Sequence, residues 1–319
     1  MVSSAIGCAC WGHNGVKRRG ILRPGIGRSS SALAPAGVAA KAGVQYAAPM
    51  PAFLCNACGT QYSPSEDPPA ACSICTDERQ FVPASGQTWT TLERLRKTHT
   101  NKFRRLAAGL TTIETVPAFG IGQRAILAQT PSGNVLWDCI ALIDEATIDL
   151  LKGLGGVAAI AISHPHYYTT MVEWSRALGG VPIHLHADDR QWVTRPDPAV
   201  QFWEGDIRPI GAGLTLVRLG GHFDGGTILH WADWNEGRGV VLSGDILQLV
   251  PSGHVSFMWS YPNLIPLSAA SVRRIAKRLE PFAFDAVYGA FSGRGQIDAN
   301  GKQVVAASVA RYIARISES

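Results

Sequence analysis

Residues 157–171 read VAAIAISHPHYYTTM, and this stretch predicts both the fold class and the functional site of the chain. The mainly apolar run 157–163 has the length of one buried strand. His164 and His166 follow it directly, on either side of Pro165. Because alternate side chains at an extended strand end point the same way, both imidazoles can reach one metal ion.

On both sides of this stretch, short apolar segments alternate with helical ones. We expect strands within 110–119, 124–130, 134–143, 157–163, 181–186, 214–219, 227–233 and 239–247, and helices within 145–155, 171–180, 268–282 and 303–316. The sequence Pro-Ser-Gly-Asn at 131–134 is typical of a hairpin turn. This alternation predicts an α/β fold in which loops at strand ends carry the site.

Two further polar residues follow predicted strands. His222 lies in the glycine-rich loop GGHFDGGT, and Asp245 lies in LSGDIL, where an apolar strand ends. Taken singly, His222 could be an ordinary polar residue and Asp245 could cap a turn. Together with the His-x-His they form an ordered set of possible metal ligands, which is far more specific than one motif.

The order of these motifs resembles that of the metallo-β-lactamase-fold hydrolase superfamily over about residues 106–319. That superfamily carries an early Asp, His-x-His-x-Asp-His, a lone His, a lone Asp and a final Gly-His-Gly. The early Asp is similar to Asp138, which we expect to brace the His-x-His loop. The resemblance implies an αββα sandwich in which a metal ion is held by His164, His166 and His222, with Asp245 able to join them.

The chain departs from the superfamily pattern at two places. The Asp-His positions fall on Tyr168 and Thr169, and the final Gly-His-Gly resembles Gly293-Arg294-Gly295. Both changes delete ligands of the second metal, so the resemblance implies a mononuclear site. We expect Arg294 to supply part of the missing positive charge and Tyr168 to place a phenol in the pocket. The alternatives are a surface arginine and a packed tyrosine.

Two Cys-x-x-Cys pairs precede this region and predict a second metal site. CNAC supplies Cys55 and Cys58, CSIC supplies Cys72 and Cys75, and thirteen residues separate the pairs. Four thiolates in two knuckles suit a tetrahedral ion, either zinc or iron. The first knuckle resembles that of rubredoxin. A structural zinc is favoured because a ribbon this small gains much of its folding free energy from the metal.

Other side chains are expected in the surroundings of the site. His184 and His186 share one face of a predicted strand, and we expect them in the pocket wall rather than as ligands. The aromatic-rich segment HVSFMWSYPN at 254–263 could line a substrate entrance or pack in the core. Cys139 is expected to be a small buried hydrophobic residue.

Composition limits the classes of protein and of partner. The 319 residues are 46% hydrophobic and 17% charged, which supports a sizeable core. No membrane-spanning segment and no membrane partner are expected. The net charge of +5 arises from six basic residues within 1–50, where no acid occurs, so nucleic acid is not an expected partner.

Residues 1–50 are rich in Ala, Ser, Gly and Arg. This composition favours a disordered transit peptide for an organelle, with the chloroplast preferred to the mitochondrion. The alternative is a disordered extension of a cytoplasmic protein. The expected domains are then a zinc ribbon at 51–85, a connecting helix or linker at 86–105, and the larger domain at 106–319.

Three functions are compatible with these motifs. The first is a metal-dependent hydrolase, with one zinc ion in the His/Asp site, that acts on a small ester, thioester, lactone or amide through an activated water. The second is a mononuclear iron oxidoreductase with a redox-active ribbon. The third is a metal-stabilised binding protein without catalysis.

Overall fold

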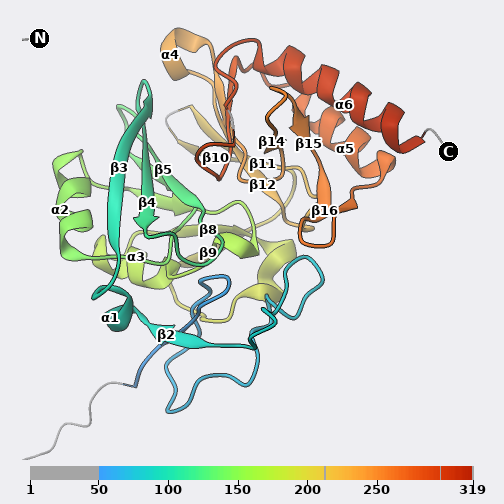
Figure 1. Ribbon diagram of the computed structural model, residues 1–319. Coiled ribbons are helices and arrows are strands. Elements are labelled where there is room, and N and C mark those ends of the chain that lie inside the picture. The colour runs from blue at the N-terminus through green and yellow to red at the C-terminus, as the bar shows by residue number, and fades with distance from the viewer. Residues whose placement is uncertain (1–49, 212, 295, 318–319) are drawn as a thin grey trace, which may run out of the picture. The chain divides into compact units, whose positions relative to one another are not determined.

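The fold is a four-layered αββα sandwich with a small cysteine ribbon at its N-terminal end (Figure 1). The computed structural model describes residues 50–211, 213–294 and 296–317, and every element below belongs to these residues. The segment expected to be a transit peptide therefore lies outside the described residues, apart from Met50. The α/β sandwich expected from the order of motifs is confirmed.

A seven-stranded sheet forms one inner layer. The first three neighbouring pairs of strands in this sheet are antiparallel, and the last three pairs are parallel. In sheet order the strands are β3 (Thr100–Ala107), β4 (Leu110–Val116), β5 (Arg124–Ala128), β6 (Val135–Trp137), β7 (Ala159–Ala161), β8 (Ile183–His186) and β9 (Val200–Trp203). Helices α2 (Glu145–Gly153) and α3 (Met171–Ala177) pack against its outer face through one shared apolar cluster.

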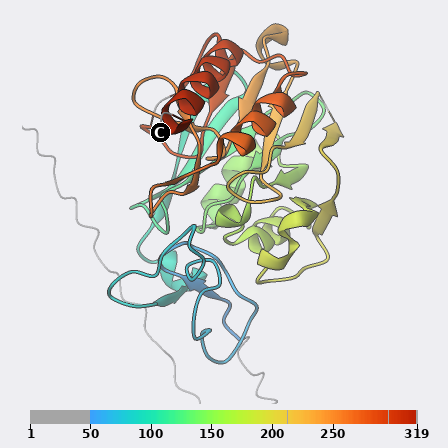
Figure 2. The same cartoon turned by 90° about the vertical axis from the view of Figure 1, so that its right-hand side faces the viewer.

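A five-stranded sheet forms the other inner layer. Its strands in order are β10 (Ile207–Gly211), β11 (Leu214–Arg218), β12 (Thr227–Trp231), β13 (Val240–Leu242) and β18 (Ala286–Tyr288). Helices α5 (Ala269–Leu279) and α6 (Gly301–Ser317) lie side by side on its outer face (Figure 2). Within this sheet of the described chain, β13 and β18 are the parallel pair.

Alternation along the strands builds the core between the layers. Ile228 and Val241 join the cluster under α5 and α6, whereas Leu229 and Leu242 join the cluster between the two sheets. Successive side chains of a strand point to opposite faces, so a strand that is apolar at every position can serve both clusters. This arrangement leaves the strand ends free to carry polar loops.

The segment between the ribbon and the sandwich contains a short helix and the start of a strand. The sequence predicts a connecting helix or linker at 86–105; α1 (Leu92–Leu95) is one turn long, and β3 begins at Thr100 within this range. Thr91 caps this turn by accepting a hydrogen bond from the Arg94 N–H, 3.3 Å away. Residues 100–107 pair with β4, and this tertiary pairing overrides their polar composition.

The cysteine ribbon contains little regular structure. Strands β1 (Phe53–Cys55) and β2 (Trp89–Thr91) pair with each other; the first knuckle begins at the last residue of β1, and the second lies in the loop between the two strands. The remaining short elements are α4 (Trp234–Gly237), β14 (Gln248–Leu249), β15 (Val255–Ser256), β16 (Met258–Ser260), β17 (Ile265–Pro266) and the 3₁₀ turns η1 (Pro165–Tyr167) and η2 (Ala187–Trp192). Among the described residues, no helix is long and apolar enough to cross a lipid bilayer.

Candidate active site and metal centres

Three loops at strand ends bring four potential metal ligands together. His164 and His166 flank the start of η1 after β7, His222 follows β11, and Asp245 follows β13. One nitrogen or oxygen atom from each residue lies within 4.8 Å of the others, and all four side chains are buried. The structure therefore assembles the histidine and aspartate set that the sequence predicted, across both sheets.

The distances within this cluster suit one tetrahedral ion. His164 Nε2 lies 3.2 Å from Asp245 Oδ1, and His222 Nε2 lies 3.2 Å from His166 Nδ1. Ligands bound about 2.1 Å from a tetrahedral ion lie about 3.4 Å from one another. His164 Nε2 and Asp245 Oδ1 are also buried without a hydrogen-bond partner. Because buried polar atoms are normally satisfied, these two atoms fit coordination to a cation.

Neighbouring groups fix the orientation of the imidazoles. His222 Nδ1 is 2.7 Å from the Trp259 carbonyl oxygen, so this nitrogen carries the proton and Nε2 is free for a metal ion. Asp138 Oδ1 accepts a hydrogen bond of 2.7 Å from the Ser163 N–H, next to His164. Asp138 thus makes the bracing contact that the sequence predicted.

A glycine allows the two ligand loops to approach closely. Gly244 has a φ of 56°, and a Cβ atom at this position would lie 2.7 Å from Ser163 Oγ. A side chain here would push apart the loops that carry His164 and Asp245. The Gly-Asp pair of the LSGDIL segment therefore has a steric cause as well as a chemical one.

Burial shifts the titration of the whole cluster. It lowers the pKa of His222 to about 4, and it places the pKa values of His164 and His166 well below the usual range. Neutral imidazole is the form that binds a metal ion. Burial also raises the pKa of Asp245 to about 7, opposed by the Tyr167 hydroxyl and by the positive charge of Arg294. A bound cation would stabilise the ionised carboxylate.

The cluster opens into a cavity of about 470 Å³. His166, Asp245, Gln248 and Tyr261 contribute its polar surface near the metal ligands. The other walls come from the ribbon and from the loops after β16 and β18, and their side chains include Arg79, Gln80, Phe81, Leu264, Phe291 and Arg294. Arg294 therefore lines the same cavity as Asp245, with its guanidinium 4.9 Å from the centre of the Phe291 ring.

Three residues expected in the pocket lie elsewhere. Tyr168 is 3% exposed and packs in the cluster under α3, because η1 turns its side chain away from the cavity. His184 and His186 do not line the cavity. His186 instead bonds to the Gly205 carbonyl oxygen at 2.9 Å and packs edge-on against Trp203. The predictions of a pocket phenol and a histidine wall are therefore wrong.

The aromatic segment 254–263 divides between the two interpretations left open. Phe257 is fully buried, whereas Tyr261 and Pro262 line the cavity. The Tyr261 hydroxyl donates a hydrogen bond of 2.5 Å to the main-chain oxygen of Asp245. Cys139 is fully buried and forms no disulfide, in agreement with its predicted packing role.

The four ribbon cysteines form the second potential metal centre. Cys55 Sγ lies 3.6 Å from Cys75 Sγ, and Cys58 Sγ lies 3.6 Å from Cys72 Sγ. These distances exclude disulfides but approach the separation of about 3.8 Å expected for sulfurs bound about 2.3 Å from one tetrahedral ion. All four thiols are buried in a cluster with few other apolar residues, which suits a centre stabilised by metal.

Sequence comparison finds a bacterial relative. No family model matches the chain. The uncharacterized protein YmaE of Bacillus subtilis (strain 168) is 48% identical over 267 residues, which are 83% of this chain and 96% of YmaE. The chain belongs to the same family as YmaE. This bacterial relative overturns the expected chloroplast or mitochondrial location, because a bacterium has neither organelle. An acid-free, Arg- and Ser-rich composition does not by itself establish that a segment directs a protein to an organelle.

Structural comparison identifies the fold of this chain. The crystal structure of the DIM-1 metallo-β-lactamase matches with a TM-score of 0.51 and 10% identity, and covers 68% of this chain and 98% of its own. The TMB-1 structure matches with a TM-score of 0.50 and 11% identity, over 68% of this chain and 99% of its own. The chain thus has the metallo-β-lactamase fold, with a four-cysteine, zinc-ribbon-like site in front.

Arg79 is a residue of the site that the sequence did not reveal. It lies in the ribbon, four residues after Cys75, and it lines the same cavity as His166 and Asp245. Its Nη1 donates a hydrogen bond of 3.3 Å to the main-chain oxygen of His222. Nothing in the local sequence CTDERQF marks this role, because only the packing of the ribbon on the His222 loop creates it.

Proposed function

We propose that this member of the YmaE family is a metal-dependent hydrolase with one metal ion in the His/Asp site. The observation that carries the proposal is the cluster of His164, His166, His222 and Asp245 beside an open cavity, with buried nitrogen and oxygen atoms that have no hydrogen-bond partner. Three imidazoles match the three protein ligands of zinc enzymes that leave the fourth position to water, and Asp245 lies beside that position.

The residues of the chain divide the work. When bound, the metal ion supplies a Lewis acid and lowers the pKa of water near it. Asp245 orients the attacking water by accepting its hydrogen bond. Arg294, on the same cavity, stabilises negative charge on the substrate, as a second cation would. Tyr168 has no part in this scheme, because it lies in the core.

The lining of the cavity indicates the class of substrate. Phe81 is 54% exposed and Leu264 is 78% exposed, and both line the cavity with Phe291. Solvent-exposed apolar side chains at the entrance of a cavity favour a ligand that carries an apolar group. Arg294 favours a carboxylate or another anion. We therefore propose a small acyl compound, an ester, thioester, lactone or amide, that carries a negative charge.

A paired substrate assay tests this proposal. A carboxylate-bearing ester and its uncharged methyl counterpart are incubated with the zinc-loaded full chain and with His222→Ala. Hydrolysis of the charged ester in preference to the neutral one, and loss of both activities in His222→Ala, is the expected result. Equal rates of hydrolysis of the two esters contradict the proposal that the substrate carries a negative charge. Activity that survives in His222→Ala contradicts metal-dependent hydrolysis.

An iron-dependent oxidoreductase is the second candidate. Its support is the ribbon, whose four thiolates suit iron as well as zinc and whose residues line the cavity. Metal analysis and visible absorption of the purified chain distinguish the two. Iron in both centres, with thiolate charge-transfer bands, supports redox chemistry, whereas two colourless zinc sites support hydrolysis.

A further inference from the structure

We propose that Arg79 is a positioning residue through which the cysteine ribbon holds the metal ligand His222 in place. The inference rests on the metal site of the proposed function but not on hydrolysis or on any substrate. Its consequence is that the two metal centres are linked. A metal ion in the ribbon should favour binding of a metal ion in the His/Asp site.

Asp77 fixes the direction of the Arg79 side chain. Asp77 Oδ1 accepts from Arg79 Nε at 2.6 Å, and Asp77 Oδ2 accepts from Nη2 at 3.0 Å. This forked pair leaves Nη1 free to reach the His222 carbonyl oxygen at 3.3 Å. Because Asp77 already offsets the charge of Arg79, the arginine serves the arrangement of the loop rather than recognition of an anion.

The guanidinium also packs on the residue next to His222. Arg79 Cζ lies 3.9 Å from the centre of the Phe223 ring, which is close cation–π contact. The same Phe223 ring stacks on the imidazole of His164, with centroids 5.3 Å apart and an interplanar angle of 26°. Arg79 therefore acts on two metal ligands, one through a hydrogen bond and one through a stacked ring.

The adjacent residue Glu78 secures the other side of His222. Its carbonyl oxygen accepts hydrogen bonds from Ser260 Oγ at 2.6 Å and from Asn263 Nδ2 at 2.9 Å. Ser260 follows Trp259, whose own carbonyl oxygen orients the His222 ring. Residues 77–79 thus hold both the main chain of His222 and the strand that fixes its imidazole.

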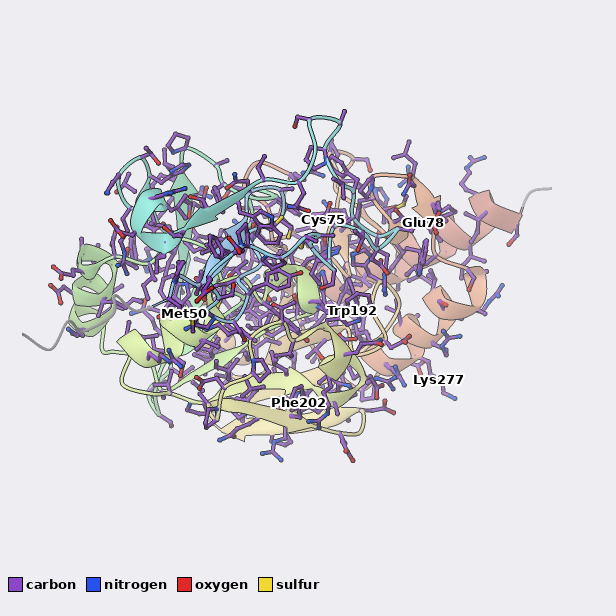
Figure 3. All side chains as sticks on the ribbon, turned by 90° about the horizontal axis from the view of Figure 1, so that it is seen from below. Met50, Cys75, Glu78, Trp192, Phe202 and Lys277 are labelled. Atoms are coloured by element: carbon purple, nitrogen blue, oxygen red, sulfur yellow. The ribbon has the colours of Figure 1, made fainter. Side chains whose placement is uncertain are left out.

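The metal-binding knuckle determines where residues 77–79 lie. Asp77 comes two residues after Cys75, and the Thr76 N–H donates to the Cys72 carbonyl oxygen at 3.0 Å. Figure 3 shows Glu78 beside the pale orange C-terminal part of the chain, which contains its partners Ser260 and Asn263. Loss of the ribbon metal releases the start of this segment, so the contacts of Arg79 and Glu78 with the His222 loop weaken.

Metal affinity measured without substrate tests the proposal. Zinc binding by the full chain is titrated against a chelating dye, for wild type, Arg79→Gln and Arg79→Lys. We expect the His/Asp site of Arg79→Gln to bind zinc about 10- to 100-fold more weakly, as is typical when the outer partner of a ligand is lost. The four-cysteine site should keep its metal. Arg79→Lys keeps the charge near Phe223 but loses the fork to Asp77, so a smaller loss is expected.

Arg190→Gln is the matched control. Arg190 also stacks on an aromatic ring, with Cζ 3.8 Å from the centre of Phe202, but it lies outside the lining of the cavity. Unchanged zinc affinity at the His/Asp site of Arg79→Gln overturns the proposal, and so does an equal loss in Arg190→Gln. A chain that binds zinc as described but hydrolyses no ester contradicts the proposed function and leaves this inference standing.

Discussion

At the scale of single residues, the site combines groups with obvious chemistry and groups known only from packing. The four potential metal ligands are marked in the sequence because each follows a strand and belongs to an ordered set. Tyr168 also belongs to the pattern, yet a single 3₁₀ turn directs it into the core. Arg79 belongs to no pattern and still contacts the His222 loop. Side-chain direction after a turn, and contact between distant segments, are not encoded in local spacing.

Replacement of Arg294 tests its role as a source of positive charge. Arg294→Ala should lower kcat/KM for a charged substrate about 10- to 100-fold, the range expected for loss of a hydrogen bond to a charged group. Zinc content should stay at the wild-type level, because a guanidinium is not a metal ligand. Arg274→Ala, on the exposed side of α5, is the control. Wild-type activity in Arg294→Ala would show that Arg294 lines the cavity without acting on the substrate.

Asp189 gives a prediction about pH. Burial raises its pKa to about 7, although its carboxylate accepts a hydrogen bond of 2.9 Å from the Gly225 N–H. A folded-state pKa above the unfolded value means that stability is fully present below the unfolded pKa and is lost as the pH rises towards the folded pKa. Asp189→Asn should remove this loss, so its free energy of unfolding should exceed that of wild type more at about pH 8 than at about pH 5. A constant difference across this range contradicts the shift.

At the scale of elements, the sequence predicted the strands that are apolar on both faces and missed others, including β3, β9 and β10. The runs that became β5, β7, β12 and β13 are short, apolar and bounded by glycine or polar residues. β3 is polar at many positions, and only its pairing with β4 makes it a strand. His186 shows the same limit, because its contacts with Gly205 and Trp203 depend on the neighbouring strand.

The ribbon is the element whose removal is most informative. Cys55→Ala should release the ribbon metal and increase hydrogen exchange across residues 51–85, while the two sheets keep their own apolar clusters. The contacts of residues 77–79 predict that zinc affinity at the His/Asp site also falls. Hydrogen-exchange mass spectrometry measures the first effect. Unfolding of the sandwich strands in this variant would show that the ribbon is not a separately stabilised element.

At the scale of the whole molecule, the four-cysteine ribbon and the His/Asp cluster meet at one cavity. The loops that carry His166 and Asp245 reach this cavity, and the ribbon adds a wall that contains Arg79, Gln80 and Phe81. The strand ends of the two sheets position the His/Asp cluster. The ribbon wall comes instead from residues 51–85, at the N-terminal end of the described chain.

The most direct test of the central claim is metal stoichiometry of the purified full chain, compared with a His164→Ala/His222→Ala variant. We expect about two metal ions per wild-type chain, one in the four-cysteine ribbon and one in the His/Asp site. The variant should retain only the ribbon metal, as shown by elemental analysis with protein quantified independently. A wild-type chain that holds only the ribbon metal would contradict the account, and so would a variant that keeps the full wild-type content.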